Sequence, residues 1–232
     1  MDAAQQMDKQ YRYQRYVYDF SRKYYLLGRD SLLQEIPLAA NETLLEIGCG
    51  TARNLVKLAY RSPAAKLYGI DASSMMLETA RAKLQGTLYE RNITLKQGLA
   101  GQITHQHFGL EQPFDHIVFS YVLSMIPHWQ TALEHALQML KPGGYIHVVD
   151  FSDQQAMPVW FRNLLMQWLD WFHVHPDPTV PAYLTQLAQR TGQLRIRQLA
   201  GRYALVAHYQ KEGESLNDDQ SAQPQIPQYL DF

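Results

Sequence analysis

Short apolar runs alternate with segments of helical spacing along most of this chain. The apolar runs comprise Leu44–Ile47, a run ending at Asp71, residues 93–97, a run beginning at Phe114, and residues 145–151. Helical spacing follows the first run and recurs over residues 73–85 and 129–140. The last of these segments ends at Lys141-Pro142-Gly143-Gly144, which predicts a turn before the fifth run. Because strands and helices alternate at this spacing, the pattern predicts an α/β fold whose parallel strands are joined by right-handed crossovers.

The two ends of the chain have different patterns. Residues 194–210 form two β-rich runs around Ala200-Gly201, which predicts an antiparallel hairpin. Residues 211–232 are rich in Gln, Asp, Ser and Pro and are predicted to be a solvated polar tail. The expected organisation is an aromatic and basic helical lid over residues 1–40, a domain over 41–210 with a helical insertion at 157–191, and the polar tail.

The glycine-containing turn after the first apolar run is the most informative motif. Glu46-Ile47-Gly48-Cys49-Gly50 links that run to a helix, and Asp71 stands about twenty residues on, where a strand-end carboxylate binds a ribose. A dinucleotide-binding turn has a third small residue where this chain has Arg53 and Asn54. An acidic residue before the turn would repel a phosphate but suits a cation. The motif therefore predicts an S-adenosylmethionine site in a class I methyltransferase fold, which is Rossmann-like.

This fold has a mostly parallel seven-stranded sheet in the order 3-2-1-4-5-7-6, with helices on both faces and a terminal antiparallel hairpin. Its ligand lies at the carboxyl ends of the strands. The predicted cofactor-binding residues are Glu46, Gly48, Cys49, Gly50, Asn54, Asp71, Ala72, Met76, Leu99, Ala100 and Ser120. Leu99 stands where related enzymes commonly place an acidic residue against the adenine, so backbone and apolar contacts are expected there.

Composition excludes several classes of partner and location. The formal net charge is −1, and Ser120-Tyr121-Val122-Leu123 replaces the motif typical of nucleobase methylation, so no nucleic acid is expected. The single cysteine suits the reducing cytoplasm, and no apolar stretch is long enough for a membrane span. His173-x-His175 has no third ligand motif nearby, so no metal is predicted.

Two aromatic segments are candidates for the substrate site. Residues 9–30 interleave six tyrosines with basic side chains, which indicates either a solvated helix packed on the domain or a lid at an anionic membrane surface. Residues 157–178 place large apolar side chains at i, i+4 spacing, which indicates either core packing or a hydrophobic lid for acyl chains. Trp160 and Trp168 are the substrate-binding candidates in this second segment.

On these residues the chain resembles a specific family. Tyr18-Asp19 with the segment from Arg22 to Asp30, the Glu46–Gly50 turn, and Trp160-Phe161 with the segment 171–174 are similar to bacterial diacylglyceryl-homoserine N-methyltransferases, over residues 8–210. The resemblance implies three methyl transfers from S-adenosylmethionine to a lipid amine, giving diacylglyceryl-trimethylhomoserine, the headgroup of a betaine lipid. It also implies a cytoplasmic enzyme at the inner membrane surface that works with a homoserine-lipid synthase.

The expected chemistry is an in-line displacement, in which positioning supplies most of the catalysis. Tyr18, Tyr25, Tyr121 and Asp150 are the predicted catalytic residues, because tyrosine faces stabilise a cation and Asp150 could orient the amine or take its proton. Asp150 could equally be a loop cap. Arg22, Lys23 and Arg29 are predicted to pair with the carboxylate of the homoserine headgroup.

Three alternatives remain open at this point. One is a phosphatidylethanolamine N-methyltransferase of the soluble bacterial type. Another is a soluble methyltransferase of small molecules, of the quinone or small-amine kind, which would need neither detergent nor vesicles. The third is a protein of the same fold that binds cofactor or a partner without catalysis.

Overall fold

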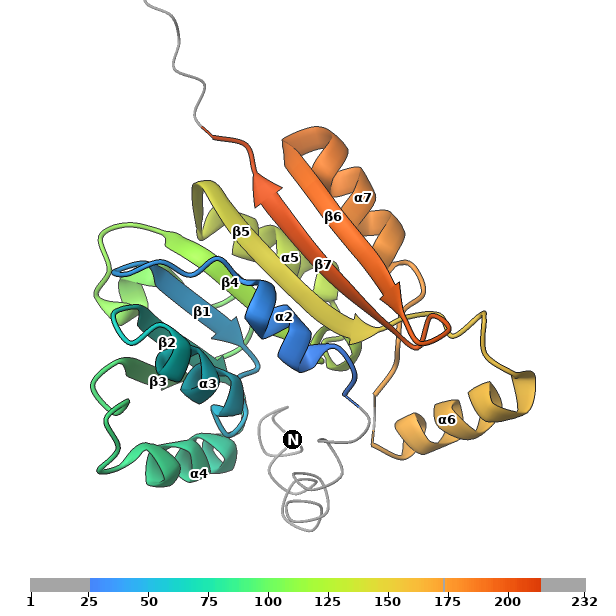
Figure 1. Ribbon diagram of the computed structural model, residues 1–232, viewed down its shortest axis with the longest axis horizontal. Coiled ribbons are helices and arrows are strands. Elements are labelled where there is room, and N and C mark those ends of the chain that lie inside the picture. Colours follow the sequence, from blue (N-terminus) through green and yellow to red (C-terminus); the bar gives the residue numbers. More distant parts are fainter. Residues whose placement is uncertain (1–25, 173, 214–232) are drawn as a thin grey trace, which may run out of the picture.

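A seven-stranded sheet forms the centre of the molecule in the computed structural model, which describes residues 26–172 and 174–213 (Figure 1). The strands are β1 (Thr43–Ile47), β2 (Lys66–Asp71), β3 (Ile93–Gln97), β4 (Phe114–Ser120), β5 (Leu140–Phe151), β6 (Gly192–Leu199) and β7 (Ala204–Lys211). Their order is β3-β2-β1-β4-β5-β7-β6, and β7 runs antiparallel to both of its neighbours. The predicted fold class and strand order are confirmed.

Helices cover both faces of this sheet (Figure 1). They are α2 (Arg29–Glu35), α3 (Arg53–Arg61), α4 (Ser74–Leu84), α5 (Trp129–Gln138) and α7 (Val180–Thr191), with 3-10 turns η1 (His105–Phe108) and η2 (Leu123–Met125). A further helix, α6 (Val159–Trp171), lies beyond the end of β5 (Figure 1). Leucines of α2, α3, α4 and α6 pack in one core cluster with Val118 and Val149 of the sheet. Leucines of α5 and α7 pack in a second cluster with Ile117 and Val148. Alternate residues of the central strands therefore fill opposite cores.

Two element boundaries differ from the prediction. Lys141-Pro142-Gly143-Gly144, expected to be a turn before the fifth strand, lies inside β5. Phe114 pairs with Leu140 and His116 pairs with Tyr145. Residues 141–144 therefore form a bulge in β5 opposite the single residue Asp115 of β4. At the other end, Lys211 pairs with Gly192 and completes β7, so the predicted polar tail begins one residue too early. Residues 214–232 lie outside the described part of the chain.

The helical insertion contains a helix whose apolar residues do not share one face. Leu165 and Leu169 of α6 are buried, whereas Trp160, Leu164 and Trp171 are 70%, 59% and 72% exposed. The single apolar face expected for this segment is therefore wrong, because its large side chains occupy both the core side and the solvent side of α6. No helix in the described part of the chain is both long and apolar enough to span a bilayer.

The described portion of the predicted N-terminal lid, residues 26–40, packs on the domain. Leu32 and Leu33 of α2 are buried in the core, with 0% and 4% of their surface exposed. Gly28 precedes this helix with φ of 79°, and a Cβ at that position would lie 2.3 Å from Leu199 Cδ1. Glycine thus permits both the left-handed conformation and the close approach of α2 to β6.

Candidate functional site

The turn between β1 and α3 is compact and rests against the segment after β4. Gly48, Gly50 and Ala52 all have positive φ, at 71°, 53° and 59°. The Cys49 N–H donates to the Ile70 carbonyl at 2.9 Å, which fastens the turn to β2. A Cβ on Gly48 would lie 2.4 Å from Val122 Cγ2. The backbone at Gly48 therefore approaches its neighbour more closely than any side chain would allow.

Asp71 at the end of β2 joins this turn to the start of α4. One carboxylate oxygen accepts from the Gly50 N–H at 2.7 Å, and the other accepts from the Ser73 N–H at 2.9 Å. Ser73 in turn caps α4 through its side chain. Its position at the carboxyl end of β2, beside the glycine turn, is the position from which a carboxylate accepts from the hydroxyls of a ribose.

Glu46 and Asn54 form a buried polar pair beneath the turn. Glu46 is 2% exposed, and one of its oxygens accepts from Asn54 Nδ2 at 2.6 Å. The guanidinium of the neighbouring Arg53 binds the Asp30 carboxylate of α2 through two contacts of 3.0 and 3.3 Å. The first turn of α3 is thus anchored by β1 on one side and by α2 on the other.

The residues predicted to surround an adenine lie along the ends of β2 and β3. Ala72 accepts at its carbonyl from Gln97 Nε2 at 3.0 Å, and the Met76 N–H bonds the capping Ser73 hydroxyl. Met76 is buried, and Leu99 is 40% exposed. Ala100 is half-buried and packs against the second core cluster. Met76 packs in the first core cluster and Ala100 against the second, so the adenine-binding role of these residues stays a prediction.

The end of β4 carries a strained residue. Tyr121 has φ of 55°, which is uncommon for a residue with a Cβ, and it is 3% exposed. Its hydroxyl donates to the Leu27 carbonyl at 2.6 Å, and its ring makes an edge contact with Phe151 at 4.9 Å. The preceding Ser120 hydroxyl is buried and has no hydrogen-bond partner among the described residues. Tyr121 therefore ties the segment before α2 to the carboxyl ends of β4 and β5.

Asp150 is a loop cap in this structure. Its carboxylate accepts from the Ser124 N–H at 3.2 Å and from the Phe151 N–H at 2.8 Å, and the residue is 2% exposed. Burial raises the pKa of Asp150 to about 6, and the hydrogen bonds from Ser124 and Phe151 limit the rise. The side chain thus fixes η2 beside the glycine turn, and its carboxyl group titrates close to neutral pH.

Only some of the remaining predicted residues belong to the described part of the chain. Tyr18, Arg22, Lys23 and Tyr25 lie outside the described residues. Arg29, which was expected to bind a lipid headgroup at the surface, is buried, with 9% of its surface exposed. Trp160 lies exposed on α6, whereas Trp168 is half-buried and makes an edge contact with Phe172 at 5.0 Å. The two tryptophans therefore lie in different environments and do not form one wall.

The residues around the glycine turn fit S-adenosylmethionine. Asp71 lies against the turn at the carboxyl end of β2, Gly48 lets the turn pack closely on Val122, and the Ser120 hydroxyl is a buried polar atom with no hydrogen-bond partner among the described residues. Buried Glu46 supplies negative charge suited to a sulfonium or ammonium group. No group of His, Cys, Asp and Glu within residues 26–172 and 174–213 is arranged to hold a metal ion.

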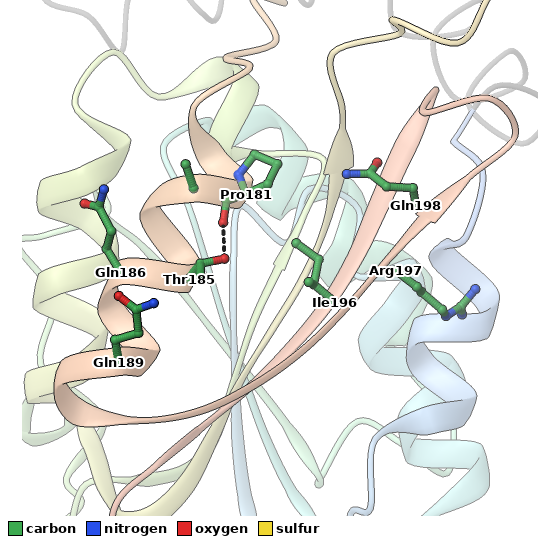
Figure 2. Close-up of a pocket in the computed structure, with 8 residues that line it drawn as sticks. Pro181, Thr185, Gln186, Gln189, Ile196, Arg197 and Gln198 are labelled. Carbon is green, nitrogen blue, oxygen red and sulfur yellow. Dashed lines mark hydrogen bonds between the residues drawn. The ribbon is translucent and has the colours of Figure 1, made fainter.

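A shallow pocket elsewhere on the molecule lies between α7 and β6 (Figure 2). It has a volume of about 520 Å³, and Figure 2 shows Pro181 and Thr185 on the side of α7 nearer to Ile196 and Gln198 of β6. Three strands, β4, β5 and β7, separate β6 from the β1 turn. This pocket is therefore separate from the candidate site.

Several residues that shape the site were not predicted from the sequence. Val122 packs against Gly48, Gln97 binds the carbonyl of Ala72, and the Leu27 carbonyl receives the Tyr121 hydroxyl. Gln97 ends its strand beside Asp71, so its position on β3 was a usable signal. The contact between Tyr121 and Leu27 left no signal in the sequence, because it joins residues 94 positions apart.

The comparisons with known proteins agree with this geometry. A family model described as a methyltransferase domain matches residues 13–194. A demethylmenaquinone methyltransferase of Lactobacillus johnsonii is 25% identical over 64% of this chain and 58% of its own length. A trans-aconitate 2-methyltransferase of Methylobacterium nodulans is 32% identical over 50% of this chain and 41% of its own length. The chain thus spans about half the length of these curated relatives.

Solved structures share the fold. An O-methyltransferase family protein from Burkholderia thailandensis superposes with a TM-score of 0.65 at 16% identity, covering 92% of this chain and 64% of that one. A SAM-dependent methyltransferase from Aquifex aeolicus gives a TM-score of 0.58 at 19% identity, covering 82% of this chain and 93% of that one. At these identities the likeness concerns the arrangement of strands and helices.

Proposed function

The chain belongs to the methyltransferase domain family, and we propose that it transfers the methyl group of S-adenosylmethionine to a small organic acceptor of the quinone, small-acid or small-amine kind. The observation that supports cofactor binding most directly is the hydrogen bond from the Gly50 N–H to the Asp71 carboxylate at 2.7 Å. The small acceptor is favoured because curated relatives are named for demethylmenaquinone and trans-aconitate. The resemblance to lipid N-methyltransferases is not supported by those names.

The bound cofactor supplies an electrophilic methyl group, and this chain's residues hold and orient the reactants. Glu46 keeps negative charge beneath the turn, and Asp71 holds the adenosyl end. The acceptor is expected at the carboxyl ends of β4 and β5, beside Tyr121 and Asp150. Because the Asp150 carboxyl titrates near pH 6, it can take a proton from an acceptor at neutral pH more readily than an ordinary aspartate.

The test is an assay for methyl transfer in buffer without detergent or vesicles. Purified full-length chain is incubated with labelled S-adenosylmethionine and a panel of dihydroxyaromatic, carboxylic and amine acceptors. Turnover of a soluble acceptor that is lost in Asp71→Ala supports the proposal. Cofactor binding with no turnover on any soluble acceptor contradicts the small-molecule assignment and leaves a lipid acceptor or a binding role.

A lipid headgroup is the second candidate, because of one surface of α6. Val159, Trp160, Leu164 and Trp171 are 59–72% exposed, and Trp160, Leu164 and Trp171 recur on one side of the helix. Tryptophan is enriched where proteins meet the lipid–water boundary, so an exposed pair on one helix suits a bilayer surface. This candidate includes peripheral binding at the cytoplasmic face of the inner membrane and pairing with a homoserine-lipid synthase.

Vesicle sedimentation distinguishes the two candidates. Wild type and a Trp160→Ser/Trp171→Ser variant are mixed with anionic phospholipid vesicles, with Tyr60→Ser as the control because Tyr60 is 78% exposed on α3. Binding lost only in the tryptophan variant supports the lipid candidate. Mass spectrometry of lipids from a host expressing this chain with a homoserine-lipid synthase then identifies the headgroup. A trimethylated homoserine lipid, or methylated phosphatidylethanolamine made without the synthase, would each replace the small-molecule assignment.

A further inference from the structure

Three histidines on adjacent strands lie in a row across one face of the sheet. His116 is on β4, His147 on β5 and His208 on β7, and His147 is paired directly with His208 in the strand register. His116 and His147 are 1% and 0% exposed, and the side chain of His208 is 9% exposed. None of these residues belongs to the candidate site described above.

The three rings form a continuous chain of contacts that ends on a carboxylate at each side. His116 Nε2 lies 3.0 Å from Glu42 Oε2, and His116 Nδ1 lies 3.1 Å from His147 Nε2. His147 Nδ1 lies 2.8 Å from His208 Nδ1, and His208 Nε2 lies 3.1 Å from Glu35 Oε2. Four hydrogen bonds therefore link Glu42 to Glu35 through three imidazoles.

Proton counting decides the charge of this chain. Each of the four contacts needs one hydrogen, and ionised carboxylates only accept. Three neutral imidazoles carry three hydrogens in total, one on each ring. One contact between ring nitrogens would then bring two lone pairs together inside the protein, where unmade hydrogen bonds are costly. One additional proton satisfies all four contacts at once.

We propose that His116, His147 and His208 form a proton-binding site that holds one excess proton between Glu42 and Glu35. When the charged ring is His116, it donates to Glu42 and to His147, His147 donates to His208, and His208 donates to Glu35. When the charged ring is His208, the two inner hydrogen bonds reverse and His147 changes tautomer. His147 is neutral in both arrangements, so the proton is exchanged between the ends.

The surroundings of the middle ring agree with this assignment. Burial lowers the pKa of His147 well below its usual value, and the neighbouring His116 and His208 lower it further. Burial also lowers the pKa of His208, while its bond to Glu35 opposes that change. The excess proton therefore belongs to an outer ring, beside a carboxylate, and not to His147.

The charged and titratable groups around the chain come from several elements. Arg61 of α3 repels a proton on His147, and Arg195 and Arg197 of β6 repel one on His208. Tyr145 of β5 stacks on His116 and His147 at 5.6 and 5.8 Å. Glu35 also binds Arg195 and Arg197, and a cavity of about 120 Å³ beside Glu35 and His208 gives that end access to solvent.

The site joins separate parts of the fold to the centre of the sheet. Glu35 is the last residue of α2, and Glu42 directly precedes β1. The segment before α2 is also bound at the other end, where the Leu27 carbonyl meets Tyr121. The excess proton thus acts as a structural ligand that fastens α2 and the entry to β1, and its release leaves one contact unbonded.

Nitrogen-15 NMR of uniformly histidine-labelled full chain tests the proton count directly. At pH 7.5 we expect one positive charge in total on these three rings, shared between His116 and His208, and a neutral His147. Signals are assigned by their loss in His116→Gln and His208→Gln. Three neutral rings, or more than one charged ring, would overturn the proposal. Because this measurement uses the wild-type chain, it holds even where a variant does not fold.

The pH dependence of stability provides the second test. Above pH ~6.5 the histidines of the unfolded chain are neutral, whereas the folded chain keeps one proton at this site. The folded chain therefore loses stability as the pH rises toward the pKa of the site. In that range the unfolding equilibrium constant should rise about tenfold per pH unit. His147→Leu should abolish this slope, whereas His128→Gln, on an exposed histidine, should retain it. An identical slope in wild type and His147→Leu would contradict the proposal.

Discussion

The Asp71 carboxylate accepts a hydrogen bond from the Gly50 N–H at 2.7 Å, across 21 residues of sequence. This bond joins the end of β2 to the turn after β1 without any contribution from a ligand. The turn is thereby held in position before any ligand arrives, and a ligand that uses Asp71 meets a carboxylate whose orientation is already fixed by Gly50 and Ser73. Such preorganisation reduces the entropy that binding must overcome.

Replacing Asp71 should weaken cofactor binding strongly. Asp71→Ala removes a charged acceptor, and such hydrogen bonds contribute about 1.5–3 kcal/mol each. We expect the affinity for S-adenosylhomocysteine to fall at least about tenfold in isothermal titration calorimetry. Asp170→Ala is the control, since the Asp170 side chain is 77% exposed on α6. Equal affinity in Asp71→Ala and wild type would remove the basis for the proposed cofactor site.

Two glycines with nearly equal φ separate backbone strain from steric contact. Gly48 and Gly86 have φ of 71° and 73°, but a Cβ on Gly86 would meet nothing within 4 Å. Gly86→Ala should therefore cost about 1–2 kcal/mol from its left-handed backbone alone. Gly48→Ala should cost about 1–3 kcal/mol more, because its Cβ collides with Val122.

Urea unfolding of both variants measures this difference. The double variant Gly48→Ala/Val122→Ala should recover part of the additional loss, since it removes the colliding methyl group. Equal losses in Gly48→Ala and Gly86→Ala would show that Val122 yields without cost.

Asp150 should give stability a pH dependence on the acid side of neutral. Its folded pKa of about 6 lies above the usual 3.8, so the buried carboxyl favours folding fully below pH 3.8 and progressively less as pH rises through 6. The difference corresponds to about 3 kcal/mol. Between pH 4.5 and 7.5, wild type should therefore lose stability relative to Asp150→Asn.

Denaturant titrations of the two proteins at both pH values provide the measurement. The asparagine loses one acceptor for the Ser124 and Phe151 N–H groups, so its absolute stability is also lower at acid pH. The informative quantity is the change in the difference between the curves. Parallel curves would mean that Asp150 titrates as an ordinary aspartate.

Two leucines test the orientation of α6. Leu169 is 1% exposed and Leu164 is 59% exposed on the same helix. Leu169→Ala should cost about 2–5 kcal/mol because it opens a cavity in the core. Leu164→Ala should change the unfolding free energy by less than about 0.5 kcal/mol. Equal destabilisation, measured by thermal or urea unfolding, would mean that both sides of α6 are covered in solution.

Much of the fold follows from local pattern. The run at 93–97 is a strand with the predicted bounds, and the run beginning at Phe114 is a strand from its predicted first residue. Asp71 meets the glycine turn because parallel strands end at one edge of the sheet. The glycines of residues 141–144 misled the prediction, since the same turn-forming residues also occur in a bulge within a strand.

The features that escaped prediction depend on tertiary pairing. Trp160 and Leu165 have similar hydrophobicity, and only the position of α6 on the domain decides that one is exposed and the other buried. Val118, Val149 and Val206 lie two residues from His116, His147 and His208 in their strands, so each histidine shares a face of the sheet with a buried valine. Their contacts span 31 and 61 residues, so the chain of rings required the strand order.

The lone cysteine of this protein sits between the two glycines of the β1 turn. Cys49 is 6% exposed, and burial, followed by the nearby carboxylates of Asp71 and Glu46, raises the pKa of its thiol well above its usual value. A thiol of this kind reacts with alkylating reagents only when the turn opens. Its labelling rate is thus a built-in reporter of occupancy: any molecule that clamps this corner should slow modification, and no engineered probe is needed to follow it.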